Sequence, residues 1–368
     1  MRARVLAALL IAVAGLAGLA GCIKGSKQFV YVTGPASNEV FGFIQHGDGT
    51  LTPMGNPNFA TGSQPSSIVI HPPGDFAYIA NFAGNNVTLL DVNSGNGELS
   101  IPTSTLIITP PTPPNIFNTG TGPIAMAIPA GAPFLFVLNQ GSANISAFTI
   151  DTGTGDLGVV AGSPFIVPAA PQAMAIAPKG NFLYVSNPAA ATVSGFSIDA
   201  KGVLTSVGAA FSMGAGATPV ALTVDPSGRF LFVADSAHNT VLGFSIQSNG
   251  TLTAMSGSPF PAGLQPKAVA TDAQGSFLFT ANFGSNDVSA FVIDSSTGNL
   301  GQISGSPFAT GGTGPGALTV TSSFLYVADQ GTNDVVAFLI SGTGKLSKVN
   351  GAPVGVPVAA AWMTSASE

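Results

Sequence analysis

The side chains able to do acid–base chemistry are few in this chain, and they are scattered along it. The 368 residues include three His and 16 Asp+Glu, against 10 Lys+Arg. General acid–base catalysis needs such groups within hydrogen-bond reach of one substrate. The motifs His-Glu-x-x-His, Cys-x-x-Cys and Gly-x-Ser-x-Gly and a phosphate-binding loop are absent from the sequence. Any chemistry therefore depends on which distant residues the fold brings together.

The candidate site residues, apart from His238 in the loop that follows, stand at equivalent points of a repeated phrase. Asp235, His238 and Asp329 are the candidate catalytic residues. The equivalent points elsewhere carry amides, which we take as candidate ligand-binding residues: Asn81, Asn139, Asn187 and Asn282. Oxygen ligands that converge on one channel suit Ca²⁺, and Asp235 and Asp329 are the candidate metal ligands. The alternative is that these Asn and Asp residues stabilise turns by bonding nearby backbone.

One unit of about 47 residues repeats seven times and must position these side chains. A strand of the type Phe-x-Phe/Tyr begins at residues 29, 76, 134, 182, 230, 277 and 324. A polar loop, a second strand such as 241–244, a Gly-rich turn and a further strand follow it. A strand of small residues such as 219–224 then completes the unit. Four short strands with turn signals between them predict one blade of a β-propeller.

The sequence therefore predicts an all-β, seven-bladed β-propeller with four antiparallel strands per blade, over residues 29–364. Segment 357–363 resembles an inner strand and has no later partner, so we expect it to complete blade 1. Trp362 is then a closure residue, and residues 365–368 form a tail. Antiparallel order puts His46, His71 and Arg229 on one face, called the bottom, and His238 on the opposite face, called the top.

The repeated phrases resemble those of the lactonase-type seven-bladed propellers. The resemblance rests on Phe182-Leu-Tyr-Val-Ser-Asn187, Phe324-Leu-Tyr-Val-Ala-Asp329 and the Gly-Ser-Pro-Phe segments at 162–165, 257–260 and 305–308. That family includes 6-phosphogluconolactonase, and Tyr31-Val-Thr-Gly34 resembles the related YVTN-type propellers. The resemblance implies lactone hydrolysis by a His, Glu and Arg set near the channel. Such a set does not converge in the expected layout, so none of its residues is carried over.

The N-terminus has the pattern of an exported bacterial lipoprotein. Arg2 and Arg4 precede an apolar stretch at 5–20, and Leu19-Ala20-Gly21-Cys22 resembles a lipobox. We expect residues 1–21 to be a signal peptide, Cys22 to be lipidated and 22–28 to form a tether. The protein is then anchored to a membrane in the cell envelope. Ile23 stands where an Asp often signals inner-membrane retention, which favours the outer membrane or cell surface.

Composition and one long insertion complete the functional expectations. Charged residues make up 7% of the chain, and the few Lys and Arg are too dispersed for a nucleic-acid surface. A Pro-rich insertion at 107–115 is a candidate rim for a protein or glycan partner, or a neutral insertion. We therefore favour a binding or scaffold module of the envelope. The alternative is a lactonase.

Overall fold

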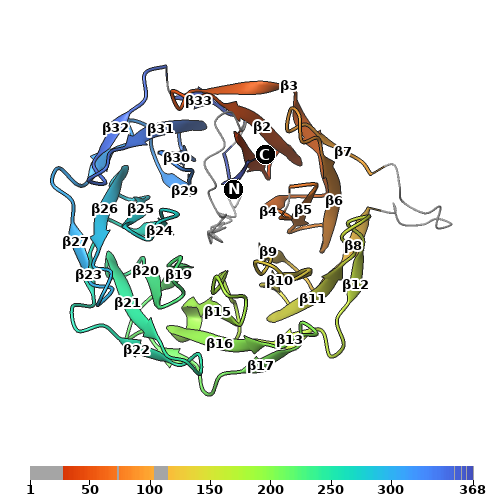
Figure 1. Ribbon diagram of the computed structural model, residues 1–368, viewed down its shortest axis with the longest axis horizontal. Coiled ribbons are helices and arrows are strands. Elements are labelled where there is room, and N and C mark those ends of the chain that lie inside the picture. Colours follow the sequence, from red (N-terminus) through yellow and green to blue (C-terminus); the bar gives the residue numbers. More distant parts are fainter. Residues whose placement is uncertain are drawn as a thin grey trace, which may run out of the picture.

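Seven four-stranded antiparallel sheets form a ring around a central axis (Figure 1). This computed structural model describes residues 28–72, 74–102, 115–351, 353–357, 359–361 and 363–367. The predicted signal peptide, Cys22, most of the 107–115 insertion and Trp362 lie outside the described residues. Within them, the seven-bladed propeller that the repeat predicts is confirmed.

Each blade presents its strands in the same order from the centre of the ring outward. The inner strands are β34 (Met363–Ser367), β4 (Pro65–Ile70), β9 (Pro123–Ala127), β14 (Ala173–Ile176), β19 (Pro219–Val224), β24 (Pro266–Thr271) and β29 (Pro315–Val320). The second strands are β1 (Gln28–Gly34), β5 (Phe76–Asn81), β10 (Phe134–Asn139), β15 (Phe182–Asn187), β20 (Phe230–Asp235), β25 (Phe277–Asn282) and β30 (Phe324–Asp329). The third strands are β2 (Glu39–Gln45), β6 (Asn86–Val92), β11 (Asn144–Ile150), β16 (Thr192–Ile198), β21 (Thr240–Ile246), β26 (Asp287–Ile293) and β31 (Asp334–Ile340).

The fourth, outer strand is continuous in blade 1 and split in two in the other blades. Blade 1 has β3 (Leu51–Ala60). The split pairs are β7 (Leu99–Ser100) with β8 (Ile116–Asn118), β12 (Leu157–Val159) with β13 (Phe165–Ile166), β17 (Leu204–Ser206) with β18 (Phe211–Ser212), β22 (Leu252–Ala254) with β23 (Phe260–Pro261), β27 (Leu300–Gln302) with β28 (Phe308–Ala309), and β32 (Leu346–Lys348) with β33 (Val354–Gly355). A single 3₁₀ turn, η1 (Pro188–Ala190), is the one helical element of the described residues.

The core lies between the blades, and the second strands contribute most to it. Every residue of β20 and β30 is buried, because both faces of these strands contact apolar side chains. Aromatic and β-branched residues suit such a position, since they fill the pleated surface on either side. The top ends of the second strands therefore lie in fixed positions around the ring, and the candidate Asn and Asp residues are each the last residue of such a strand, with His238 in the loop after β20.

The C-terminal strand closes the ring, but it begins later than the sequence suggests. The strand β34 pairs antiparallel with β1, with Met363 opposite Val32 and Ser367 opposite Gln28. The prediction that the last strand completes blade 1 is confirmed, whereas its placement at 357–363 is wrong. Residues 365–367, predicted as a tail, belong to the sheet. The small residues at 357–361 resemble the other inner strands, and the N–H of Ala361 donates to the Thr33 carbonyl of β1, but the paired strand itself begins at Met363.

Candidate functional site

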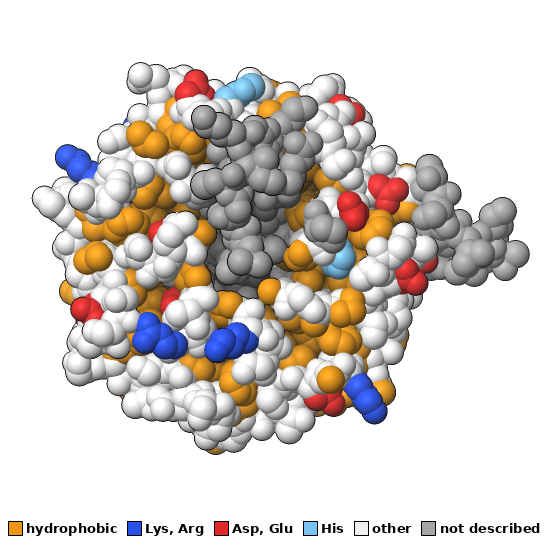
Figure 2. Space-filling model, in the orientation of Figure 1, with side chains coloured by type: hydrophobic (Ala, Val, Ile, Leu, Met, Phe, Trp, Pro, Cys, Tyr) orange, Lys and Arg blue, Asp and Glu red, His pale blue; other side chains and the backbone are white. Residues whose placement is uncertain are grey.

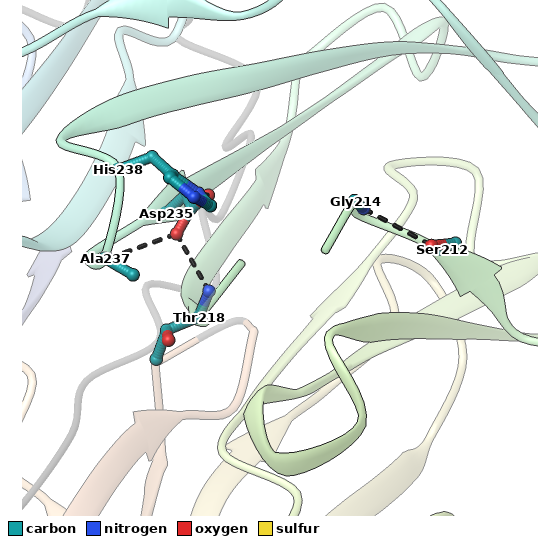
Figure 3. Close-up of polar contacts among 6 residues, drawn as sticks. All are labelled: Ser212, Gly214, Thr218, Asp235, Ala237 and His238. Atoms are coloured by element: carbon teal, nitrogen blue, oxygen red, sulfur yellow. Dashed lines mark hydrogen bonds and ion pairs between the residues drawn. The ribbon is translucent and has the colours of Figure 1, made fainter. Parts of the chain in front are cut away.

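A histidine and a buried carboxylate meet at the top of blade 5. The Nδ1 atom of His238 lies 2.6 Å from Oδ2 of Asp235 (Figure 3). The Asp235 side chain is 2% exposed and the His238 side chain 51% exposed, so the imidazole extends from the interior toward solvent. Asp235 ends β20, and the loop to β21 returns His238 over it. This pair is the strongest acid–base arrangement of the described residues.

Two backbone N–H groups hold the Asp235 carboxylate in place. Oδ1 accepts hydrogen bonds from the N–H of Thr218 at 2.8 Å and of Ala237 at 3.1 Å (Figure 3). A carboxylate oxygen accepts hydrogen bonds and does not donate them, so Nδ1 of His238 is the donor in the third hydrogen bond. The other ring nitrogen, Nε2, then carries the free lone pair. Asp235 thus orients His238 as a base that faces solvent.

The other six blades show which residues replace His238 at the equivalent position, the third residue after the second strand. The third loop residue is Ser37, Gly84, Ser142, Ala190, Ser285 or Thr332 in the other blades. The hydroxyls of Ser142, Ser285 and Thr332 accept a backbone N–H from the loop that leads into the blade. In blade 5 the Asp235 carboxylate accepts the N–H of that loop instead. His238 is therefore free of the structural role that Ser142, Ser285 and Thr332 perform.

The four candidate ligand-binding amides are buried beneath the top loops. Asn81, Asn139, Asn187 and Asn282 are each 0% exposed. Their Nδ2 groups donate to side chains on the third strand, among them the hydroxyls of Thr88, Ser146, Ser194 and Ser289. These amides bridge two strands of their own blade. The structure thus places them in a network within the blade, away from the solvent that His238 faces.

The sequence carries a signal for this difference that the predictions above did not include. Each of the four amides has Ser or Thr seven residues later, whereas the residues seven after Asp235 and Asp329 are Leu242 and Val336. An amide needs the hydroxyl as an acceptor for its N–H, and a carboxylate has no N–H to give. The Asn-to-Asp change and the loss of the hydroxyl therefore occur together, in blades 5 and 7 only.

Asp329 has a different environment from Asp235. It is 1% exposed, and neither carboxylate oxygen has a hydrogen-bond partner. Burial is the main cause that raises the pKa of Asp329 to about 6, and the charge of Asp334 raises it further. The Thr310 hydroxyl and the Gly312 N–H act in the opposite direction, but neither reaches it with the geometry of a full hydrogen bond. Asp329 lies too deep to contact a substrate directly.

Lys267 is a further residue that the sequence-based predictions did not include. It is the second residue of β24, the inner strand of blade 6, and β24 lies beside β19 of blade 5. Its amine lies 4.5 Å from the centre of the Phe283 ring, and burial lowers the pKa of the Lys267 amine. No charge signal marked it in the sequence, because its significance depends on the neighbouring blade. It brings a cation to the same end of the ring as His238.

The remaining titratable candidates are on the bottom face, as predicted. His46 follows β2, where its Nε2 lies 2.8 Å from the Thr52 hydroxyl, and His71 follows β4. Arg229 precedes β20, with its side chain near Phe230. A cavity of about 720 Å³ also opens on this face between blades 6 and 7, beside Phe277, Ile303 and Lys345. Its lining includes no His, Asp or Glu, so it offers no acid–base pair.

The charge distribution of the surface agrees with the low charged content of the sequence. Figure 2 shows one face of the disc, on which charged side chains are few. In the described part of the chain, no helix has the length and apolar character needed to cross a bilayer.

Comparisons with known proteins agree with this architecture. A model of the family described as "Lactonase, 7-bladed beta-propeller" matches residues 22–221, 212–314 and 269–362. A 6-phosphogluconolactonase of Bacillus subtilis is 30% identical over 114 residues, which cover 31% of this chain and 31% of that protein. The chain belongs to the seven-bladed lactonase propeller family. The resemblance that the repeated phrases suggested is thereby confirmed.

Solved structures share the whole fold at low sequence identity. The periplasmic gluconolactonase of Pseudomonas aeruginosa has a TM-score of 0.75 at 19% identity, over 93% of this chain and 99% of its own. A candidate 6-phosphogluconolactonase from Bacteroides uniformis has a TM-score of 0.77 at 18% identity, over 92% and 99%. At such identities the likeness concerns the fold alone.

Proposed function

We propose that this protein hydrolyses lactones at the top of blade 5, with His238 as the general base. The observation that carries the proposal is the 2.6 Å contact between His238 Nδ1 and the buried Asp235 carboxylate, which leaves Nε2 free toward solvent. Membership of the lactonase family and the gluconolactonase among the solved relatives support the reaction class. They favour the lactonase alternative over the binding module that the sequence first suggested.

The reaction follows from the orientation of the imidazole. His238 Nε2 accepts a proton from a water molecule, whose oxygen forms a bond to the lactone carbonyl carbon. The positive charge that the ring gains is stabilised by Asp235 through Nδ1. The tetrahedral intermediate then collapses, the ring C–O bond breaks, and the proton on Nε2 passes to the departing oxygen. The product is a hydroxy acid, and His238 returns to its starting state.

Direct attack by water fits the surroundings of His238. Ser212 stands apart from the imidazole and accepts a hydrogen bond from the N–H of Gly214 (Figure 3). No serine hydroxyl is hydrogen-bonded to the His238 ring among the described residues, so a Ser–His nucleophile has no support. Lys267, on the adjoining inner strand, lies at the same end of the ring and is a candidate to bind the carboxylate product.

The test is lactone hydrolysis by the purified protein on a panel of sugar-acid and simple lactones. We expect turnover above the spontaneous rate and a loss of about 10²–10⁴-fold in kcat/KM in His238→Ala. Asp235→Asn should also lower kcat, because the amide cannot stabilise the charged imidazole equally well. His46→Ala is the matched control, since it removes a histidine from the opposite face.

Two results would overturn the proposal. One is a folded protein that hydrolyses none of the panel faster than buffer does, which would return attention to a binding module. The other is turnover that His238→Ala and His46→Ala leave equally intact, which would place catalysis elsewhere.

A further inference from the structure

Two carboxylates oppose each other where the second and third strands of blade 7 meet. Asp329, the last residue of β30, is the direct cross-strand partner of Asp334, the first residue of β31. The equivalent pairs elsewhere are Gly34 with Glu39, Asn81 with Asn86, Asn139 with Asn144, Asn187 with Thr192, Asp235 with Thr240 and Asn282 with Asp287. Blade 7 is thus the one described blade with two acids here. Like charges directly opposite each other destabilise a strand pair.

Blade 6 shows how this position is satisfied without a charge conflict. There Asn282 Nδ2 donates to Asp287 Oδ1 at 2.7 Å and to the Ser289 hydroxyl at 2.9 Å. In blade 7 the amide is replaced by Asp329 and the hydroxyl by Val336. Both oxygens of Asp329 and Oδ1 of Asp334 are buried without a hydrogen-bond partner. Three buried carboxylate oxygens thus lack a hydrogen bond of full geometry, although the Thr310 hydroxyl and the Gly312 N–H lie near Asp329.

The surrounding side chains do not neutralise the pair. Lys348, on the outer strand β32, is near enough to favour the charged form of Asp329 slightly, but no ion pair joins it to either acid in the described part of the chain. Burial raises the pKa of Asp334 as well. An uncompensated buried charge is strongly unfavourable. A cation bound between the two carboxylates would remove this penalty at neutral pH.

We propose that Asp329 and Asp334 bind a calcium ion at the top of blade 7. All the donors are hard oxygens, with the hydroxyls of Thr310 and Thr332 beside the two carboxylates. Ca²⁺ accepts such ligands in flexible geometry, and water completes its coordination. The site is separate from the His238–Asp235 pair in blade 5, so it does not rest on the proposed reaction. Its role is to hold blade 7 together next to the blade that closes the ring.

The test is calcium binding by the purified protein after metal removal with EGTA and dialysis. At pH 7.5 we expect calorimetric titration with CaCl₂ to give one site per chain. We also expect the Tm to rise by about 2–5 °C in 1 mM CaCl₂. Asp329→Asn recreates the Asn–Asp pair of blade 6. It should weaken calcium binding by at least about tenfold and make the calcium-free protein more stable than the wild type.

Asp287→Asn in blade 6 is the matched control, because it removes one acid at the equivalent position and should leave the calcium effect unchanged. The absence of calcium binding in the wild type would overturn the proposal. So would an equal calcium response in Asp329→Asn. A tighter response to MgCl₂ than to CaCl₂ would overturn the choice of ion. If Lys348→Gln destabilises the protein and no calcium binds, Lys348 is the neutralising group and the metal site is refuted.

Discussion

A carboxylate in place of an amide changes what a buried side chain is able to do, and this chain makes that change twice. Asp235 gains three donors, including His238, and becomes the support of an exposed base. Asp329 gains none and faces a second acid. The same substitution thus has two consequences, which depend on what the adjoining loop offers. At the residue scale, the neighbours decide whether a buried acid is useful or costly.

The burial of the Asp329 carboxyl predicts that the free energy of unfolding of the calcium-free protein falls as the pH rises. Its pKa of about 6 in the folded state lies above the ordinary value of 3.8, so folding favours the protonated form. This contribution to the free energy of unfolding is fully present below about pH 4 and is lost as the pH rises through 6. The loss amounts to about 3 kcal/mol. Urea unfolding in EGTA at pH 4.5, 5.5 and 7.5 measures it.

The comparison is between the wild type and Asp329→Asn, in which this loss should disappear. Asp334 titrates in the same sense, and Lys348 opposes it weakly. Burial lowers the pKa of His71, which gives the opposite slope in both proteins and cancels in the difference. Identical pH slopes in the two proteins would show that the Asp329 carboxyl is not destabilised by burial.

At the scale of elements, each blade contacts the next through a glycine and an aromatic ring. In each blade, a glycine with positive φ lies in the bottom turn between the third and fourth strands. It faces the first Phe in the second strand of the preceding blade. The pairs are Gly97–Phe29, Gly155–Phe76, Gly202–Phe134, Gly250–Phe182, Gly298–Phe230, Gly344–Phe277 and Gly49–Phe324. Where the second strand has Tyr, its hydroxyl donates to the same glycine's carbonyl, as Tyr184 does to Gly250 at 2.9 Å. The repeated Phe therefore marks the joint between blades.

The Gly-Ser-Pro-Phe segments also have a structural role, which lies within one blade. They interrupt the outer strand, so some N–H groups of the third strand have no backbone carbonyl of the outer strand to bond. The hydroxyls of Ser163, Ser258 and Ser306 accept those N–H groups at 2.9–3.0 Å. The phrase that carried the family resemblance is thus a structural device, in agreement with its lack of catalytic groups.

The joint between blades predicts a contrast between two glycines. Gly250 and Gly208 have nearly the same φ, +83° and +82°, but a Cβ at Gly250 would collide with the Phe182 ring and one at Gly208 meets nothing. Gly250→Ala should therefore destabilise the protein by about 1–3 kcal/mol more than Gly208→Ala, which bears the backbone strain alone. Urea unfolding of both variants measures the difference. Equal losses would mean that the joint has room for a methyl group.

At the scale of the whole molecule, ring closure depends on one short strand. β34 covers most of the inner edge of β1, and the Tyr326 hydroxyl adds a hydrogen bond from blade 7 to the Gly49 carbonyl in blade 1 at 3.0 Å. An uncovered strand edge pairs readily with other chains. A chain that ends at residue 362 should therefore unfold at a markedly lower temperature and elute as larger species in size-exclusion chromatography. Unchanged Tm and elution would show that β34 is dispensable.

The lipid anchor and the location in the cell envelope stay predictions from the sequence. Cys22 and the residues before it lie outside the described residues, as does most of the 107–115 insertion. Neither lipidation nor a partner on that rim follows from the propeller itself.

The sequence by itself determined the number of blades, the strand order and the face on which each candidate lies. These properties follow from period-two hydrophobic patterns and turn residues, which are local and repeat seven times. The tertiary structure decided where the closing strand begins, that Asp235 supports His238, and that Asp329 opposes Asp334 without a donor. Such facts depend on side-chain directions and on distances of a few ångströms between neighbouring strands and loops, which no local pattern specifies.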